Sequence, residues 1–192
     1  MQASGLIVDM LFCRRGDRRL FGSLDLRVES GGVLHLVGPN GIGKTSLLRM
    51  LAGLLTVQTG SIKWAGTTAY LDSKPALDEH LPLGQALDFW CKLDGANEAP
   101  LAQLGLERLA DIPVRFLSTG QRKRVGLARL IGQNADHWLL DEPLNGLDVQ
   151  GVSLVERLIA ERRAAGGVVV VASHQPLALP DAQVLDLRDH PA

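Results

Sequence analysis

Aromatic residues and cysteine are scarce in this sequence. Aromatic side chains make up 4% of the 192 residues and hydrophobic residues 46%, so a core must be largely aliphatic. The length is sufficient for one domain with such a core. The two cysteines, Cys13 and Cys91, are isolated and have no CxxC partner. We interpret them as reduced thiols in the core of a cytosolic protein.

Long apolar runs and an excess of charge are also missing. The longest apolar run of consequence is Val168–Ala172, whereas a membrane-spanning helix needs about 20 apolar residues. Residues 1–5 lack the basic and apolar stretches of a signal peptide. The formal net charge of −1 gives no bulk attraction to nucleic acid or to an anionic membrane. These absences predict a chain with no membrane span and no nucleic-acid partner.

Apolar runs alternate with helical patterns, which predicts an α/β fold with a mostly parallel sheet and an antiparallel β portion near the N-terminus. Strands are expected at residues 6–13, 23–28, 33–37, 61–64, 67–71, 138–140, 168–172 and 184–187. Helices are expected at residues 45–52, 82–93 and 122–131, and around Val152, Val155, Leu158 and Ile159. Helical patterns dominate residues 73–133, which predicts a helical subdomain inserted into a single domain that spans residues 1–192.

The segment after the third predicted strand matches the phosphate-binding pattern GxxxxGK[ST] at every position. Glycines allow the backbone N–H groups to turn toward phosphate oxygens, and the following helix adds its positive N-terminal end. Lys44 would reach the β- and γ-phosphates, and the Thr45 hydroxyl would ligate Mg²⁺. No guanine-reading NKxD motif is present, which argues against a GTPase, and the phosphate loop alone does not determine which other class of nucleotide-binding protein this is. The residues expected to bind the nucleotide are Gly38, Pro39, Asn40, Gly41, Ile42, Gly43, Lys44, Thr45 and Ser46.

Two carboxylates end the predicted strand at residues 138–140. If this strand is adjacent to the strand of the phosphate loop, Asp141 would hold Mg²⁺ through water, and Glu142 would orient and activate the attacking water. His174 follows another predicted strand at the sheet edge where ligands bind in open α/β folds, so it would hydrogen-bond the γ-phosphate. The alternatives are a polar turn for residues 141–143 and a surface histidine for His174.

Residues 117–121, LSTGQ, precede the predicted helix at 122–131. Ser118 and Gln121 fit a capping box, which is one interpretation. The segment also resembles the LSGGQ signature of ABC ATPases, with Thr119 in place of a glycine, and the order of motifs resembles that family over nearly the whole chain. The resemblance implies ATP hydrolysis by a head-to-tail homodimer. In it, Ser118, Thr119, Gly120 and Gln121 would contact the ATP held by the other subunit.

The chain is most similar to the ATP-binding subunits of bacterial haem exporters in cytochrome c maturation. The resemblance is carried by residues 38–53, 117–130, 138–143, 148–152 and 172–177. It implies a subunit that powers a separate integral membrane permease and is held by it at the cytoplasmic face of the bacterial inner membrane. An exporter of another substrate and a soluble ABC ATPase not coupled to transport are the alternatives.

The sequence departs from the ABC pattern at two places. Most members carry a glutamine after the third strand, near Mg²⁺ and the coupling surface, where this chain has Ser73 followed by Lys74. We expect Ser73 and Lys74 to serve coupling, together with Asp148 in a segment that resembles the D-loop of the family. The aromatic residue that stacks on adenine is replaced by Arg14 or Arg15, which would either stack on the base or remain solvated in a turn.

Overall fold

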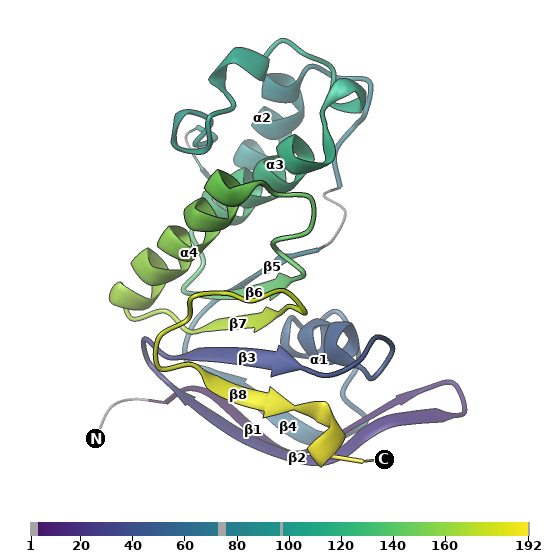
Figure 1. The fold of residues 1–192 in the computed structure, drawn as a ribbon. Helices are drawn as coiled ribbons and strands as arrows, with labels where there is room; N and C mark the ends of the chain where they lie inside the picture. Colours follow the sequence, from purple (N-terminus) through teal and green to yellow (C-terminus); the bar gives the residue numbers. More distant parts are fainter. Residues whose placement is uncertain (1–3, 73–75, 97, 192) are drawn as a thin grey trace.

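The computed structural model describes residues 4–72, 76–96 and 98–191 (Figure 1). Every predicted strand and helix is present, with ends that differ by a few residues. The strands are β1 Ser4–Arg15, β2 Arg18–Glu29, β3 Val33–Val37, β4 Thr59–Trp64, β5 Thr68–Leu71, β6 His137–Asp141, β7 Val169–Ala172 and β8 Gln183–Asp186. The α-helices are α1 Lys44–Leu51, α2 Leu83–Asp94, α3 Thr119–Gly132 and α4 Val149–Ala164. Short 3₁₀ turns lie at Ala102–Leu104, Glu107–Leu109, Val114–Phe116 and Leu187–Asp189.

The strands form two sheets. Five parallel strands have the order β5-β6-β7-β3-β8, and an antiparallel sheet has the order β2-β1-β4. The predicted α/β class is therefore confirmed. The condition that β6 is adjacent to β3 is not met, because β7 lies between them and pairs with both. Helix α1 nevertheless packs on β6 as well as β7, so the start of α1 can approach the end of β6.

Side chains of the parallel strands alternate between two hydrophobic clusters, one on each face of the sheet. In β7, Val169 and Val171 belong to the cluster that contains α4, whereas Val170 and Ala172 belong to the cluster that contains α1. Figure 1 shows α1 and the antiparallel sheet on one side of the parallel sheet and α4 on the other. Burial on both faces explains why these strands are continuous apolar runs in the sequence.

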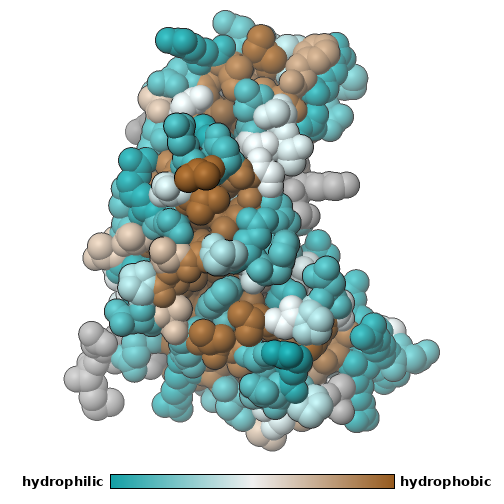
Figure 2. Space-filling model, in the orientation of Figure 1, coloured by the Kyte–Doolittle hydropathy of each residue, from teal (hydrophilic) through white to brown (hydrophobic). Residues whose placement is uncertain are grey.

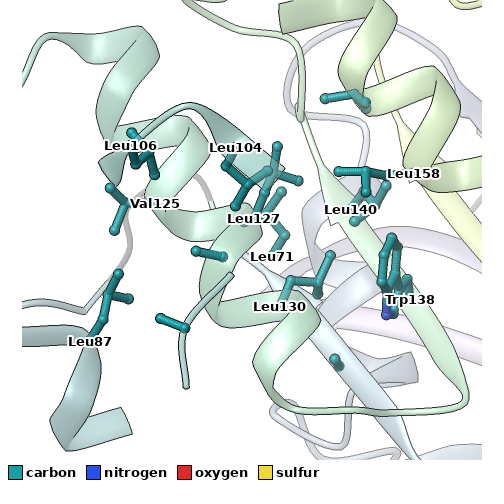
Figure 3. Close-up of a cluster of buried hydrophobic side chains, with 14 of the residues drawn as sticks. Leu71, Leu87, Leu104, Leu106, Val125, Leu127, Leu130, Trp138, Leu140 and Leu158 are labelled. Carbon is teal, nitrogen blue, oxygen red and sulfur yellow. The ribbon is translucent and has the colours of Figure 1, made fainter. Parts of the chain in front are cut away.

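Helices α2 and α3 and the three 3₁₀ turns between them occupy the chain between β5 and β6. As predicted, α2 ends at Gly95, whose left-handed backbone (φ 73°) lets its N–H donate to the carbonyl of Cys91. Apolar side chains of this region continue into the core against the parallel sheet. Figure 3 shows Val125 and Leu127 of α3 in one cluster with Leu71 and Leu140 of the strands. This packing fixes α3 against the ends of β5 and β6.

The face of the molecule in Figure 2 is largely hydrophilic, with patches of hydrophobic residues between polar ones. In the part of the chain that the structure describes, no helix is both long and apolar enough to cross a membrane. Cys13 and Cys91 are free and buried, as predicted, and burial raises the pKa of both thiols. At neutral pH they are therefore uncharged and belong to the core.

Candidate active site

The phosphate loop connects β3 directly to α1. Gly38, Gly41 and Gly43 have φ values of 130°, 78° and 125°, a region that residues with a Cβ rarely adopt. Gly43 is also confined, since an added Cβ would lie 3.1 Å from the Phe21 ring. The loop therefore wraps around the beginning of α1, where backbone N–H groups of the first turn are available to an anionic ligand.

Lys44 folds back over the loop. Its Nζ donates hydrogen bonds to the carbonyls of Gly38 at 2.7 Å and Pro39 at 3.3 Å, and the residue is 8% exposed. The ammonium is thus held at the mouth of the loop by acceptors of the loop itself. A phosphate oxygen bound there would be a stronger, charged acceptor for the same group.

Asp141 is 5% exposed at the end of β6 and accepts hydrogen bonds from Thr45 and from the Tyr70 hydroxyl, the latter at 3.2 Å. Burial raises the pKa of its carboxyl, and the two hydrogen bonds oppose that shift. Tyr70, near the end of β5, was missed by the motif analysis because it belongs to no motif. The structure thus brings Asp141 to the first turn of α1.

The oxygens of Thr45 and Asp141 fit Mg²⁺, which prefers hard oxygen ligands and retains several waters. Within residues 4–72, 76–96 and 98–191, no group of three or more His, Cys, Asp and Glu side chains could hold a metal alone. Phosphate oxygens and water would therefore complete the shell of an ion bound here. This donor set is typical of an ion that arrives with a nucleotide.

Glu142 and His174 contact each other. Each follows the end of one of the neighbouring strands β6 and β7, and the Nδ1 of His174 lies 2.8 Å from the Oε2 of Glu142. The Glu142 backbone is left-handed, with φ 47°, and its N–H donates to the carbonyl of Ala172 at 2.8 Å. This conformation turns the glutamate out of the strand direction. Such backbone strain in a residue with a Cβ is concentrated at functional sites.

The signature segment caps α3. The Ser118 hydroxyl accepts from the N–H of Gln121 at 3.2 Å, and the Gln121 side chain accepts from the N–H of Ser118 at 2.8 Å. The predicted capping box is therefore present. Thr119 packs against Gly146, where an added Cβ would lie 2.7 Å from the threonine methyl group.

The signature segment lines a surface cavity of ≈ 550 Å³. Its lining residues are Gly105, Leu106, Ser118, Thr119, Gly120, Gln121, Arg124, Gly146, Leu147 and Asp148. No residue of the phosphate loop lines this cavity. Within one subunit, the signature and the phosphate loop therefore belong to different surfaces. The signature surface is open to a second molecule.

The structure also places Asp148 and Arg14, two further residues that the sequence analysis singled out. Asp148 caps α4, where its Oδ1 accepts from the N–H of Gly151 at 2.7 Å and from Arg124 at 3.1 Å, and these bonds lower the pKa of its carboxyl. Arg14 bonds within its own turn, to the carbonyl of Gly16 and to Asp17. That geometry agrees with the alternative of a turn charge rather than a base-stacking residue. Ser73 and Lys74 lie outside the described residues.

Three features at one edge of the parallel sheet define a P-loop nucleoside triphosphatase. They are the phosphate loop, the buried aspartate at the first turn of α1 and the Glu–His pair. The sequence model described as ABC transporter matches residues 21–145, so the chain belongs to the ABC transporter family. The predicted enzyme class, an ATPase of the ABC type, is thereby confirmed.

The most similar relatives narrow the family further. The cytochrome c biogenesis ATP-binding export protein CcmA of Novosphingobium aromaticivorans is 52% identical over 189 residues, 98% of each chain. CcmA of Zymomonas mobilis is 47% identical over 180 residues, 92% of this chain and 81% of its own. An ABC transporter ATP-binding protein from Pyrococcus furiosus has the same fold, with a TM-score of 0.80 at 24% identity, and the match covers 97% of this chain and 99% of that one.

Proposed function

We propose that this chain is the ATP-hydrolysing subunit of a haem exporter that serves the maturation of c-type cytochromes. The observation that supports this proposal most is the 52% identity to a cytochrome c biogenesis export protein along almost the full length of both chains. In this proposal, the chain is a single ABC ATPase domain in which residues 73–133 form the inserted helical subdomain. It is held at the cytoplasmic face of the inner membrane by a permease, which selects the transported molecule.

In the proposed reaction, ATP and water give ADP and phosphate. Lys44 exchanges the carbonyls of Gly38 and Pro39 for oxygens of the β- and γ-phosphates. Thr45, and Asp141 through water, would hold Mg²⁺, and the bound ion would offset charge on the phosphate oxygens. Glu142 accepts a proton from the attacking water as the oxygen–phosphorus bond forms. His174 holds the Glu142 carboxylate in place and donates to the γ-phosphate as negative charge moves toward the leaving ADP.

The second part of the proposal is a homodimer that forms around ATP. The open cavity at the signature lies at the N-terminus of α3, an electropositive place that suits the γ-phosphate of a nucleotide held by another subunit. Two subunits placed head to tail would then share two nucleotides. Asp148 would transmit changes across this interface, because it caps α4 and also contacts Arg124 of α3.

Ser118→Arg is expected to leave nucleotide binding to the monomer unchanged and to lower ATP hydrolysis by at least about a hundredfold, since a bulky side chain would block the docking γ-phosphate. Binding of a fluorescent ATP analogue and phosphate release are measured side by side. Ser153→Arg, at an exposed position of α4, is the matched control and should behave as wild type. Normal hydrolysis by Ser118→Arg would mean that the signature is only a helix cap.

The permease would dock at the groove of ≈ 350 Å³ between the end of α1, β5 and α3. Leu54, Leu71, Asp72, Ala76 and Arg129 are among its lining residues, and Leu54 is 65% exposed. An exposed leucine next to charged groups suits a partner helix with an apolar face and a polar rim. Asp72 and Ala76, which line the groove, flank Ser73 and Lys74 in the sequence, so the proposed coupling role of Ser73 and Lys74 would involve the same partner.

A strain that makes only Lys44→Ala protein is expected to lose mature c-type cytochromes, because the permease would receive no energy from hydrolysis. Haem staining of periplasmic cytochromes measures this loss. A strain with Lys63→Ala, an exposed lysine of β4, is the control and should stain normally. Normal staining in the Lys44→Ala strain would contradict the assignment to haem export, although not the ATPase activity itself.

A further inference from the structure

Lys123 is the buried member of three consecutive basic residues in α3. It is 6% exposed, whereas its neighbours form ion pairs nearer the surface, Arg122 with Glu79 at 2.9 Å and Arg124 with Asp148 at 3.1 Å. Successive residues of a helix point about 100° apart, so one of three adjacent side chains can face inward while the others face solvent. The run of charges is therefore not a uniformly solvated surface.

The Lys123 ammonium lacks a hydrogen-bond partner. Among the described residues, the buried side-chain atoms with no such partner are Lys123 Nζ, Arg129 Nε, Trp138 Nε1 and Arg162 Nε. Arg162 lies 4.8 Å above the ring of Trp138, and Arg129 lies 3.4 Å above the ring of Trp90. The two arginines thus gain a cation–π contact with a ring, whereas no such contact is found for Lys123 among the described residues. A buried charge without hydrogen bonds is costly unless an opposite charge is near.

The opposite charges that act on Lys123 are carboxylates of the active site. Burial lowers the pKa of Lys123, and Asp141, Glu142 and Asp72, in that order, oppose the shift. The carboxylates also act on one another, because Asp72 and Glu142 both raise the pKa of Asp141. Arg49 lies 3.4 Å from Asp72 and supplies a second cation there. Leu127, one turn after Lys123 in α3, packs in one cluster with Leu71 and Leu140, which immediately precede Asp72 and Asp141. The packing therefore places Lys123, 6% exposed, as a buried cation near these carboxylates.

Lys123 cannot easily turn away from these carboxylates. Its helix is anchored two and four residues later by Val125 and Leu127, which belong to the hydrophobic cluster of Figure 3 and are 0% and 1% exposed. The same helix begins at Ser118, where the capping box fixes its first turn. The backbone that carries Lys123 is therefore held in place, and the 6% exposure of the residue shows that its side chain lies inside rather than on the surface.

We propose that Lys123 is a positioning residue of the hydrolysis site, whose ammonium offsets the charge of Asp141 and Glu142 and competes with a divalent cation for them. The inference rests on the proposed role of Asp141 toward Mg²⁺. It follows that the subunit without nucleotide holds divalent cations weakly. Phosphate oxygens are then needed to bring the ion in, so the ion enters and leaves together with the nucleotide.

Lys123→Met removes the charge and keeps a side chain of similar length. The probe is Mn²⁺, titrated into the nucleotide-free protein, with the free ion followed by electron paramagnetic resonance. We expect Lys123→Met to lower the dissociation constant of Mn²⁺ about tenfold, since one repelling charge is removed from a poorly solvated site. Lys123→Arg keeps the charge and should restore the wild-type constant. If Lys123→Met does not fold, as judged by circular dichroism, Lys123→Gln takes its place with the same expectation.

Lys92→Met, at an exposed position of α2, is the matched control for the loss of one positive charge. The inference is overturned if the neutral variant of Lys123 and wild type bind Mn²⁺ within twofold of each other, or if Lys92→Met shifts the constant equally. Binding of a fluorescent ADP analogue in excess EDTA should be the same for all variants. If wild type bound no fluorescent ATP analogue in the presence of Mg²⁺, the proposed function would fail, independently of Lys123.

Discussion

Glu142→Gln is expected to lower ATP turnover by about a thousandfold while ATP binding remains intact. An amide cannot accept the proton of the attacking water, whereas it can still receive the hydrogen bond that His174 Nδ1 makes at 2.8 Å. Lys44, Thr45 and Asp141 are not altered by the change. The variant should therefore bind ATP, close around it and stop before hydrolysis.

The measurement combines phosphate release with gel filtration in Mg-ATP. In the proposed mechanism, the Glu142→Gln protein elutes as a dimer with ATP and as a monomer with ADP, since the γ-phosphate closes the interface. Glu156→Gln, in α4, is the control for loss of a carboxylate away from the phosphate loop. Turnover near the wild-type rate would remove Glu142 from the role of base, and a variant that stays monomeric in ATP would contradict the sandwich dimer.

Lys44→Ala should abolish hydrolysis, with a loss of at least about a thousandfold, because it removes the ammonium that is held over the phosphate loop and would stabilise the transferring phosphoryl group. The structure adds a second effect. The ammonium that lies at the mouth of the loop, and that would bind oxygens of the β- and γ-phosphates, is removed, so the loop should also bind nucleotide less tightly. Both binding and catalysis are expected to fall, in contrast to Glu142→Gln.

Phosphate release and equilibrium binding of a fluorescent ATP analogue test this prediction on the purified protein. Lys63→Ala is the matched control on the exposed side of β4 and should retain both properties. Thermal unfolding without nucleotide checks that the variant is folded. If Lys44→Ala hydrolysed ATP at the normal rate, the phosphate loop would have to be reassigned.

The phosphate loop could be predicted in detail because its conformation is specified locally. Glycines with positive φ, a short apolar strand and a following helix lie within about twenty residues of one another, so no distant contact is needed to define them. The capping box at Ser118 is local in the same sense. These elements were predicted with ends correct to a few residues.

Features that depend on contacts between distant parts of the chain were harder to predict from the sequence. No local motif specifies the order of strands in a sheet, so the direct adjacency of β6 and β3 could only be assumed as a condition, and β7 in fact separates them. That same strand order brings Glu142 against His174, a contact that the motifs alone do not imply. Lys123 belongs to the basic run at residues 122–124, and its two neighbours form ion pairs nearer the surface. Nothing in this run indicates that its middle residue is buried. Its burial depends on the packing of α3 against distant strands.

Glu142 adopts a backbone conformation that glycine would adopt at lower cost. For a residue with a Cβ, the left-handed region costs about 1–2 kcal/mol relative to the right-handed helical region. Glycine at this position would relieve the strain but would lack the carboxylate. Selection for thermal robustness alone would therefore remove the proposed catalytic base. In the proposed mechanism, stability and catalysis conflict at this residue, and the protein retains the less stable solution.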